Sequence, residues 1–418
     1  MPSPDIIVQT VATARRLGRA GAVAGVLLLS ALVLKCGTPT GPPLPLPPLD
    51  PELVAEGREI FRFDTFGDET FWADTARLHE VITQAVSPEL ALQVGLKVDA
   101  DALPQAVKDA ILAGEVDLTS PATTVTLLKL NAVVGVMGTV ETVEGRDTLV
   151  RVGITCALCH STVDNSFTEG IGGRLDGWPN RDLNVGAIIA LSPAITPAQK
   201  EVYNSWGPGM YDARFSIDGL NIPVVMPPAL GLRGVSREIY TGDDTLSYWN
   251  AYVAVTQMHG RGRFVDPRLG ISVVHSPDLV TSKLPALREY QHSLETPAAD
   301  AGAVDEAASQ RGRAVFNGVA QCATCHIPTE SFTDVNRGVL HQPAAVGQDP
   351  AYAARSITKQ YRTTPLRLVF RPPFTQGPYF HDGSAATLDA VVDHYVALLG
   401  LSLTAQQKTD LVEYLKTL

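Results

Sequence analysis

The chain has 418 residues, of which 45% are hydrophobic and 18% are charged, and its formal net charge is −11. This length is sufficient for two or three domains, each with a buried core. The acidic balance argues against nucleic acid as a partner. Thirty prolines and 35 glycines predict many turns between helices rather than one smooth bundle.

The N-terminal stretch resembles an export signal. Residues 20–34 form the apolar run AGAVAGVLLLSALVL, and several arginines precede it. A basic region followed by a short apolar run is typical of a signal peptide, and this run is somewhat short for a full membrane span. We therefore expect residues 1–36 to be a signal peptide or a membrane anchor. The body of the protein is then periplasmic or otherwise exported to the cell envelope.

Three fates of this signal remain open at the sequence level. Cys36 ends it and could accept a lipid, although Lys35 is the wrong residue for that recognition. An uncleaved anchor and ordinary cleavage are the alternatives. The proline-rich residues 37–51 then predict a semi-rigid linker.

Residues 52–150 show helical patterns such as ARLHEVITQAV and LPQAVKDAILAG. They precede the first cysteine motif of the chain body. We expect a helical extension that packs on the domain that follows, at residues 151–295.

Four of the five cysteines lie in two copies of the pattern C-x-x-C-H, one in each half of the chain. The residues of the two motifs are Cys156, Cys159, His160, Cys322, Cys325 and His326. Disulfides do not require an adjacent histidine, and a thioredoxin-like site requires a βαβ context that the sequence lacks. A structural zinc site would place its cysteine pairs much closer together in the sequence.

Covalent haem c explains the whole pattern. Two thiols one helical turn apart can bond to the two vinyl groups of one porphyrin, and the adjacent histidine can reach its iron. We therefore predict a di-haem c-type cytochrome with two covalently bound haem c groups. His160 and His326 are the predicted proximal iron ligands.

The second half reads as one small cytochrome domain. Residues 296–308 are rich in small residues and predict a linker to a domain at 309–418. A helix leads into the second motif, and Thr404 and Gln407 predict a capping box at the start of a terminal helix. The segments that follow the two motifs, PPALGLRGVSREIYTGDDTLSYWNAYVAV and TTPLRLVFRPPFTQGPYFHDGSAATLDAVVDHYVAL, match loosely, which suggests an internal repeat.

The segment YRTTPLRLVFRPPFTQGPYFHDGSAATLDAVVDHY, residues 361–395, resembles the C-terminal domain of bacterial di-haem cytochrome c peroxidases and MauG-like proteins. The resemblance covers residues 309–418 well, and EGREIFRFDT near the start resembles the opening of that family only faintly. It implies a mainly α fold with two packed cytochrome c-like haem domains. The helical extension and the export signal or anchor precede them.

The resemblance also implies a distal ligand for the second haem. The corresponding position carries methionine in the peroxidases and tyrosine in MauG, and here it is Tyr395. Its helical spacing predicts an inward-facing side chain, and the alternatives are His394, His341 or a tyrosine that only packs beside the haem. No methionine follows Cys325, which excludes His/Met ligation from within this domain.

The first haem has two methionine candidates on its distal side. Met226 lies in IPVVMPPAL, where proline fixes the backbone beside the sulfur. Met258, or His259 beside it, is the second candidate, and an open position is the third. A methionine that only fills the core is the default alternative for both.

Arginines are the expected partners of the haem propionates. The glycine-rich residues 170–187 contain Arg174, Trp178 and Arg181 and are expected to wrap the first haem. Arg367 is the corresponding candidate in the second half.

Two functions follow from this pattern, and we favour the first. Two six-coordinate haems would transfer electrons between redox-partner proteins, with membrane attachment through the N-terminus as an open alternative. A peroxidase or MauG-like oxidoreductase would need an open iron position and a polar group above it. Glu169 is a candidate for that group only by its proximity to the first motif, so the catalytic residues are unknown. A haem-bearing subunit without its own turnover is a third hypothesis.

Overall fold

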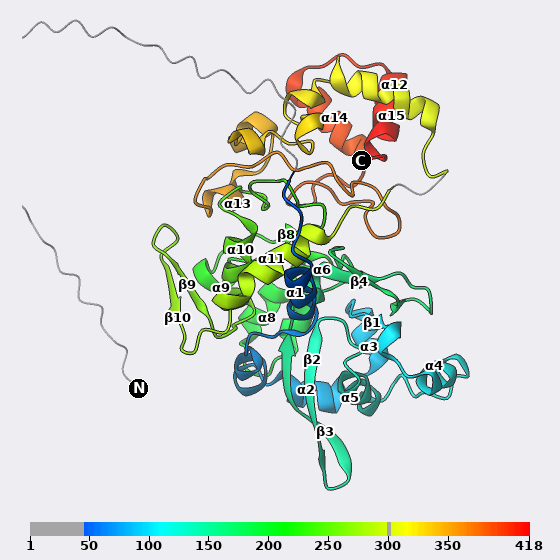
Figure 1. The fold of residues 1–418 in the computed structure, drawn as a ribbon, viewed down its shortest axis with the longest axis vertical. Helices are drawn as coiled ribbons and strands as arrows, with labels where there is room; N and C mark the ends of the chain where they lie inside the picture. The colour runs from blue at the N-terminus through cyan, green and yellow to red at the C-terminus, as the bar shows by residue number, and fades with distance from the viewer. Residues whose placement is uncertain (1–45, 299–301) are drawn as a thin grey trace, which may run out of the picture. The chain divides into compact units, whose positions relative to one another are not determined.

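The computed structural model describes residues 46–298 and 302–418, and residues 47–418 belong to one unit of mainly helical structure (Figure 1). The predicted signal or anchor at 1–36 and most of the linker at 37–51 lie outside the described residues. Among the described helices, none is both long enough and apolar enough to cross a membrane.

The first half is closed by a pair of helices that come from its two ends. Helix α1 (Pro51–Phe63) packs closely against α11 (Leu284–Ser293). Gly57 permits this approach, because a Cβ atom there would collide with the backbone carbonyl of Ala286.

The second half repeats this arrangement. Helix α12 (Glu306–Asn317) packs against α15 (Ala405–Leu415), and a Cβ atom on Gly312 would collide with the carbonyl of Asp410. The predicted capping box at Thr404 is present at the start of α15. An edge-on ring pair accompanies each crossing, at 5.5 Å in the first half and 5.2 Å in the second. These shared features support the internal repeat.

Residues 52–150, which the sequence predicts as a helical extension packed on the first domain, contain most of α1 at their start. The contacts of α1 make it the first helix of the first half, equivalent to α12, and the residues between it and the first motif are an insertion. The insertion contains a π-helix (Thr70–Thr75), α2 (Leu78–Ala85), α3 (Pro88–Gln93), β1 (Val98–Asp99), α4 (Gln105–Leu112), α5 (Pro121–Lys129), β2 (Val136–Val143) and β3 (Arg146–Ile154).

A β-hairpin ends this insertion, where the sequence analysis expected helices. Strands β2 and β3 pair antiparallel around Glu144 and Gly145, which have φ values of 51° and 78°. Positive φ at both central residues is the requirement of a type I′ turn, whose twist matches that of the strands. The hairpin leads directly into the first cysteine motif.

The remaining elements are short and are connected by turns. They are α6 (Ala157–His160), β4 (Ser161–Val163), β5 (Ile171–Gly172), β6 (Arg174–Asp176), α7 (Val185–Ala190), α8 (Pro197–Asn204), β7 (Met210–Tyr211), α9 (Phe215–Asp218), β8 (Val224–Val225), α10 (Leu246–Tyr252), a π-helix (Val253–Gln257), β9 (Arg263–Asp266), β10 (Ile271–Val274), α13 (Pro350–Ala354) and α14 (Leu388–Leu399). The described strands pair two by two, and only β1 with β5 is parallel.

Buried ion pairs join the two halves. Arg355 of the second half lies 2.9 Å from Asp212 and 2.7 Å from Asp218 of the first. Asp243 pairs with Arg214 at 2.7 Å and also accepts two backbone N–H groups from the segment after α13. The side chains of Arg355, Asp212 and Asp243 at this junction are buried, whereas the Asp218 side chain is 31% exposed.

Replacing Gly312 with alanine is expected to destabilise the second half by about 2–3 kcal/mol. The added methyl group forces α12 away from α15, and overpacking of this kind costs ~1–3 kcal/mol. Guanidinium unfolding followed by circular dichroism measures the change. Arg313→Ala, on the exposed neighbouring position, is the control and should change the free energy of unfolding little. Equal stability of the two variants would contradict the close approach at Gly312.

Candidate functional site

The first cysteine motif forms a short helical turn at the end of the hairpin. The N–H of His160 donates to the carbonyl of Cys156 at 3.2 Å, so the motif is wound into one turn of helix α6. Burial raises the thiol pKa of both Cys156 and Cys159 to about 12. Burial also lowers the pKa of His160 to about 4, so its imidazole is neutral at physiological pH.

The imidazole of His160 is enclosed by protein. Its Nδ1 atom is buried without a hydrogen bond of ordinary geometry. The backbone carbonyl of Pro227 approaches the ring closely enough to oppose the lowering of its pKa. A neutral and buried imidazole of this kind is suited to binding a metal.

The second motif closes in the same way. The N–H of His326 donates to the carbonyl of Cys322 at 2.9 Å, and its Nδ1 atom lies 3.0 Å from the carbonyl oxygen of Phe332. This contact requires the proton on Nδ1 in the neutral ring, which leaves the lone pair on Nε2 to bind a metal. Burial lowers the pKa of His326 and raises that of Cys322 to about 11.

None of the four described cysteines forms a disulfide. Cys325 has a carboxylate and an imidazole nearby, since its ligand atom and those of Asp334 and His341 all lie within 4.8 Å of one another. His341 Nε2, however, is already placed 2.9 Å from Asp334 Oδ2 and 3.0 Å from Thr363 Oγ1. These contacts occupy the imidazole that the sequence analysis kept as an alternative distal ligand.

Tyr395 reaches the second motif from helix α14. Burial, together with the nearby thiols of Cys325 and Cys322, raises the pKa of its hydroxyl to about 12. The hydroxyl makes no hydrogen bond with any described residue. By contrast, Nε2 of the neighbouring His394 is 3.1 Å from the carbonyl oxygen of Val346. Of these two side chains, Tyr395 is the one that lies near the thiols and makes no hydrogen bond with a described residue.

The two methionine candidates of the first half lie in different parts of its core. Met226 is 3% exposed and shares a hydrophobic cluster with Leu158, against which Cys159 packs. Met258 is 4% exposed and belongs to the cluster that contacts Cys156. Both belong to hydrophobic clusters that contact the first motif, and iron ligation by Met226 remains a prediction.

His259 is held in a strained turn after Met258. Its φ is 64°, its ring stacks on Phe71 with centroids 3.5 Å apart, and burial lowers its pKa to about 4. The indole of Trp72 donates to the carbonyl of Met258 at 3.0 Å. These contacts tie the turn to the π-helix of the insertion.

The arginines that were predicted to bind the haem propionates differ in their hydrogen bonds and ion pairs. Arg181 is buried, and its Nε and Nη1 atoms have no hydrogen-bond partner. Its nearest charged or phenolic neighbours are Tyr240 and Tyr379, and burial lowers its pKa. Arg174 also has buried Nε and Nη1 atoms without a hydrogen bond of ordinary geometry, but its Nε atom lies 3.0 Å from Asp99 Oδ2, which supplies a counter-charge that Arg181 lacks. An anionic group at Arg181 would therefore satisfy a guanidinium that the protein leaves unmatched.

Arg367, predicted to bind a propionate of the second haem, lies at the junction between the two halves. It donates to the carbonyl of Gly231 and, at 2.7 Å, to the hydroxyl of Ser331. Trp178, which was expected near the first haem, meets Phe374 of the second half edge-on at 5.4 Å. The glycine-rich segment thus reaches across to the second half.

Tyr211 and Gln257 lie near the first motif and were not predicted from the sequence. The Tyr211 hydroxyl donates to Gln257 Oε1 at 2.7 Å. Burial, with Cys159 as the first charged neighbour, raises the pKa of Tyr211 well above its usual value. No local motif marks either residue, because their contact depends on folding of segments far apart in sequence.

No family model matches the chain. One curated protein, the methylamine utilization protein MauG of Methylorubrum extorquens, is 31% identical over 156 residues. The match covers 32% of this chain and 42% of that protein, so the chain spans less than half of its relative. Part of this chain is homologous to MauG.

Two solved structures share weaker likeness. Hydrazine synthase of Kuenenia stuttgartiensis has a TM-score of 0.35 and 22% identity, over 52% of this chain and 79% of that one. A MauG-like protein associated with microbial copper homeostasis has a TM-score of 0.31 and 20% identity, over 46% and 72%. The relation to MauG therefore stands on the sequence match.

Proposed function

We propose that this protein is a di-haem c-type cytochrome that transfers electrons outside the cytoplasm. One observation carries the proposal: each C-x-x-C-H motif winds into a helical turn in which a half-buried imidazole, neutral at physiological pH, lies beside two half-buried thiols. The homology of part of the chain to MauG supports it. When attached, each haem c supplies a one-electron redox centre.

The protein's own residues would hold these groups in defined ways. The two thiols of each motif provide the covalent attachment, and Nε2 of His160 or His326 provides the proximal ligand. The Phe332 carbonyl keeps the proton of His326 on Nδ1 and so fixes the orientation of the ring. Arg181 offers two unengaged N–H groups to a carboxylate.

Redox-partner proteins are the proposed donors and acceptors, and nucleic acid is not a proposed partner. The proposed location is the periplasm or cell envelope, on the basis of the export signal or anchor that the sequence predicts at residues 1–36.

Replacing Tyr395 with phenylalanine is expected to change the absorption and EPR spectra of one haem and leave the other as in the wild type. The expected change follows from the proposed binding of its hydroxyl to the second haem. Tyr414→Phe is a matched control, because Tyr414 packs on Phe316 within the helix pair of the same half. Identical spectra of Tyr395→Phe and wild type would remove Tyr395 as a ligand.

A peroxidase or MauG-like oxidoreductase is the second candidate. Glu169 is exposed, which does not suit a proton donor above iron. Asp68 is a fully buried carboxyl beside the first motif, and it accepts the N–H of Ile154 at 3.2 Å. Burial raises its pKa to about 9, so it is protonated at neutral pH and could act as a general acid.

Spectroscopy of the oxidised and half-reduced protein separates the two functions. Two low-spin haems that bind neither carbon monoxide nor cyanide are the result expected for an electron carrier. A high-spin haem that binds these ligands, with peroxide consumption that Asp68→Asn reduces, would establish the enzyme instead. Purified protein without covalently bound haem would reject both.

A further inference from the structure

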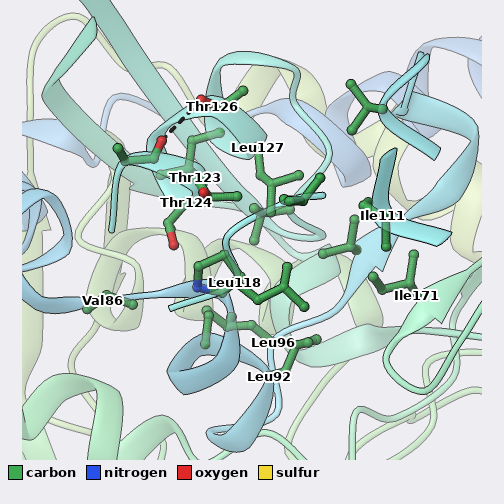
Figure 2. A pocket seen from close by; sticks show the side chains of 18 of the residues that line it. Val86, Leu92, Leu96, Ile111, Leu118, Thr123, Thr124, Thr126, Leu127 and Ile171 are labelled. Atoms are coloured by element: carbon green, nitrogen blue, oxygen red, sulfur yellow. Dashed lines mark hydrogen bonds between the residues drawn. The ribbon is translucent and has the colours of Figure 1, made fainter. Parts of the chain in front are cut away.

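A cavity of about 470 Å³ lies within the insertion, among α2, α3, α4 and α5 (Figure 2). Its wall is mainly aliphatic, its polar members are Lys97, Asp117, Thr123, Thr124 and Thr126, and no Phe, Tyr or Trp occurs among the described residues that line it. Leu92, Leu96, Ile111, Leu127 and Ile171 are prominent members of this wall. A partly open pocket of this size greatly exceeds the ~30 Å³ share of one water molecule.

The apolar side of helix α4 faces this cavity. Ala106, Val107, Ala110 and Ile111 all line it, and no residue of the helix is buried. An amphipathic helix is normally stabilised by burying its apolar face. A ligand in the cavity would bury this face of α4.

The polar side chains of the wall are mostly engaged. Thr123 and Thr126 donate to backbone carbonyls at 2.7 and 3.1 Å, and Lys97 pairs with Asp182 at 2.5 Å. Thr124 Oγ1 is buried without a partner, so the wall holds one unmatched neutral hydroxyl. This wall therefore suits a hydrocarbon body better than a charged or multiply polar molecule.

We propose that the cavity binds the aliphatic chain of a fatty acid or a lipid. Its volume is within the ~300–1,000 Å³ of small-molecule sites, and apolar cavities accept apolar ligands in place of water. The absence of aromatic side chains from its wall favours a flexible chain over a flat ring, since a ring gains from stacking. This inference does not depend on the redox function.

Calorimetric titration of the full haem-loaded chain with palmitate tests the proposal. One palmitate per chain is expected to bind. Ala110→Phe fills the cavity and should weaken binding at least tenfold. Ala113→Phe makes the same change just past the end of α4, at an exposed residue outside the cavity wall, and should bind as the wild type does. Ala106→Phe repeats the test from a second position if Ala110→Phe does not fold.

Two outcomes would overturn the proposal: no binding by the wild type, or equal palmitate affinity in the wild type and a folded cavity-filling variant. Incubation with phosphatidylcholine vesicles, followed by re-isolation and mass spectrometry, identifies the source of the chain. Uptake of phospholipid by the wild type and not by Ala110→Phe assigns a membrane lipid. Binding of palmitate alone assigns a free fatty acid.

Discussion

Replacing both Cys322 and Cys325 with serine is expected to remove one of two covalently bound haems and leave the other. Serine has no thiol to form the thioether bond, and the first motif lies in a separate half with its own buried histidine. The intact mass should fall by one haem, and the pyridine haemochrome absorbance per chain should fall by half. Replacing Cys156 and Cys159 should have the reciprocal effect.

Cys36→Ser is the control, because Cys36 is the one cysteine outside the two motifs. Its haem content should equal that of the wild type. Two haems retained after loss of the second motif's thiols would contradict the assignment of that motif. A wild-type mass without any haem would overturn the proposed function as a whole.

Features defined by local sequence were predictable. The capping box at Thr404 and the amphipathic helices of the second half depend on residues within one or two turns, and α14 and α15 are found where they were expected. The inward placement of Tyr395 follows from the same helical period. The motif turns are also local, since each closes within five residues.

Features that depend on distant contacts were not predictable in this way. The pairing of α1 with α11 joins residues at opposite ends of the first half. Because the insertion separates α1 from the first motif, the sequence does not show that the pair α1 and α11 is equivalent to the pair α12 and α15. Gly57 and Gly312 carried a signal, because each precedes a short apolar stretch at the same offset from a buried phenylalanine. This signal becomes visible when the sequence of α1 is aligned with that of α12, and not when the segments after the two motifs are aligned.

The β-hairpin was missed for a different reason. Its strands are rich in valine and threonine and flank Glu144 and Gly145, which is a recognisable strand and turn pattern. The expectation of a wholly helical extension rested on the clearer helical patterns that precede it. The Tyr211–Gln257 contact had no comparable signal, because the two residues are brought together only by tertiary folding.

Replacing Arg355 with leucine is expected to lower the free energy of unfolding by about 3 kcal/mol or more. The Arg355 side chain is 4% exposed and that of Asp212 is fully buried. Removing the cation leaves this carboxylate inside the protein without its counterion, and breaking a buried pair costs ~3–5 kcal/mol. Two backbone N–H groups still donate to Asp212, which places the expected loss at the lower end of that range.

Arg337→Leu provides a matched comparison within the same half. Arg337 pairs with Glu330 at 3.0 Å, but its side chain is 55% exposed, and exposed pairs contribute ~0–1 kcal/mol. In guanidinium, the free energy of unfolding of Arg355→Leu should therefore be lower than that of Arg337→Leu by about 2 kcal/mol or more. Adding Asp212→Asn to Arg355→Leu should recover part of the loss, because a neutral amide needs no counterion. If Arg355→Leu is no less stable than Arg337→Leu, the charged junction does not hold the two halves together.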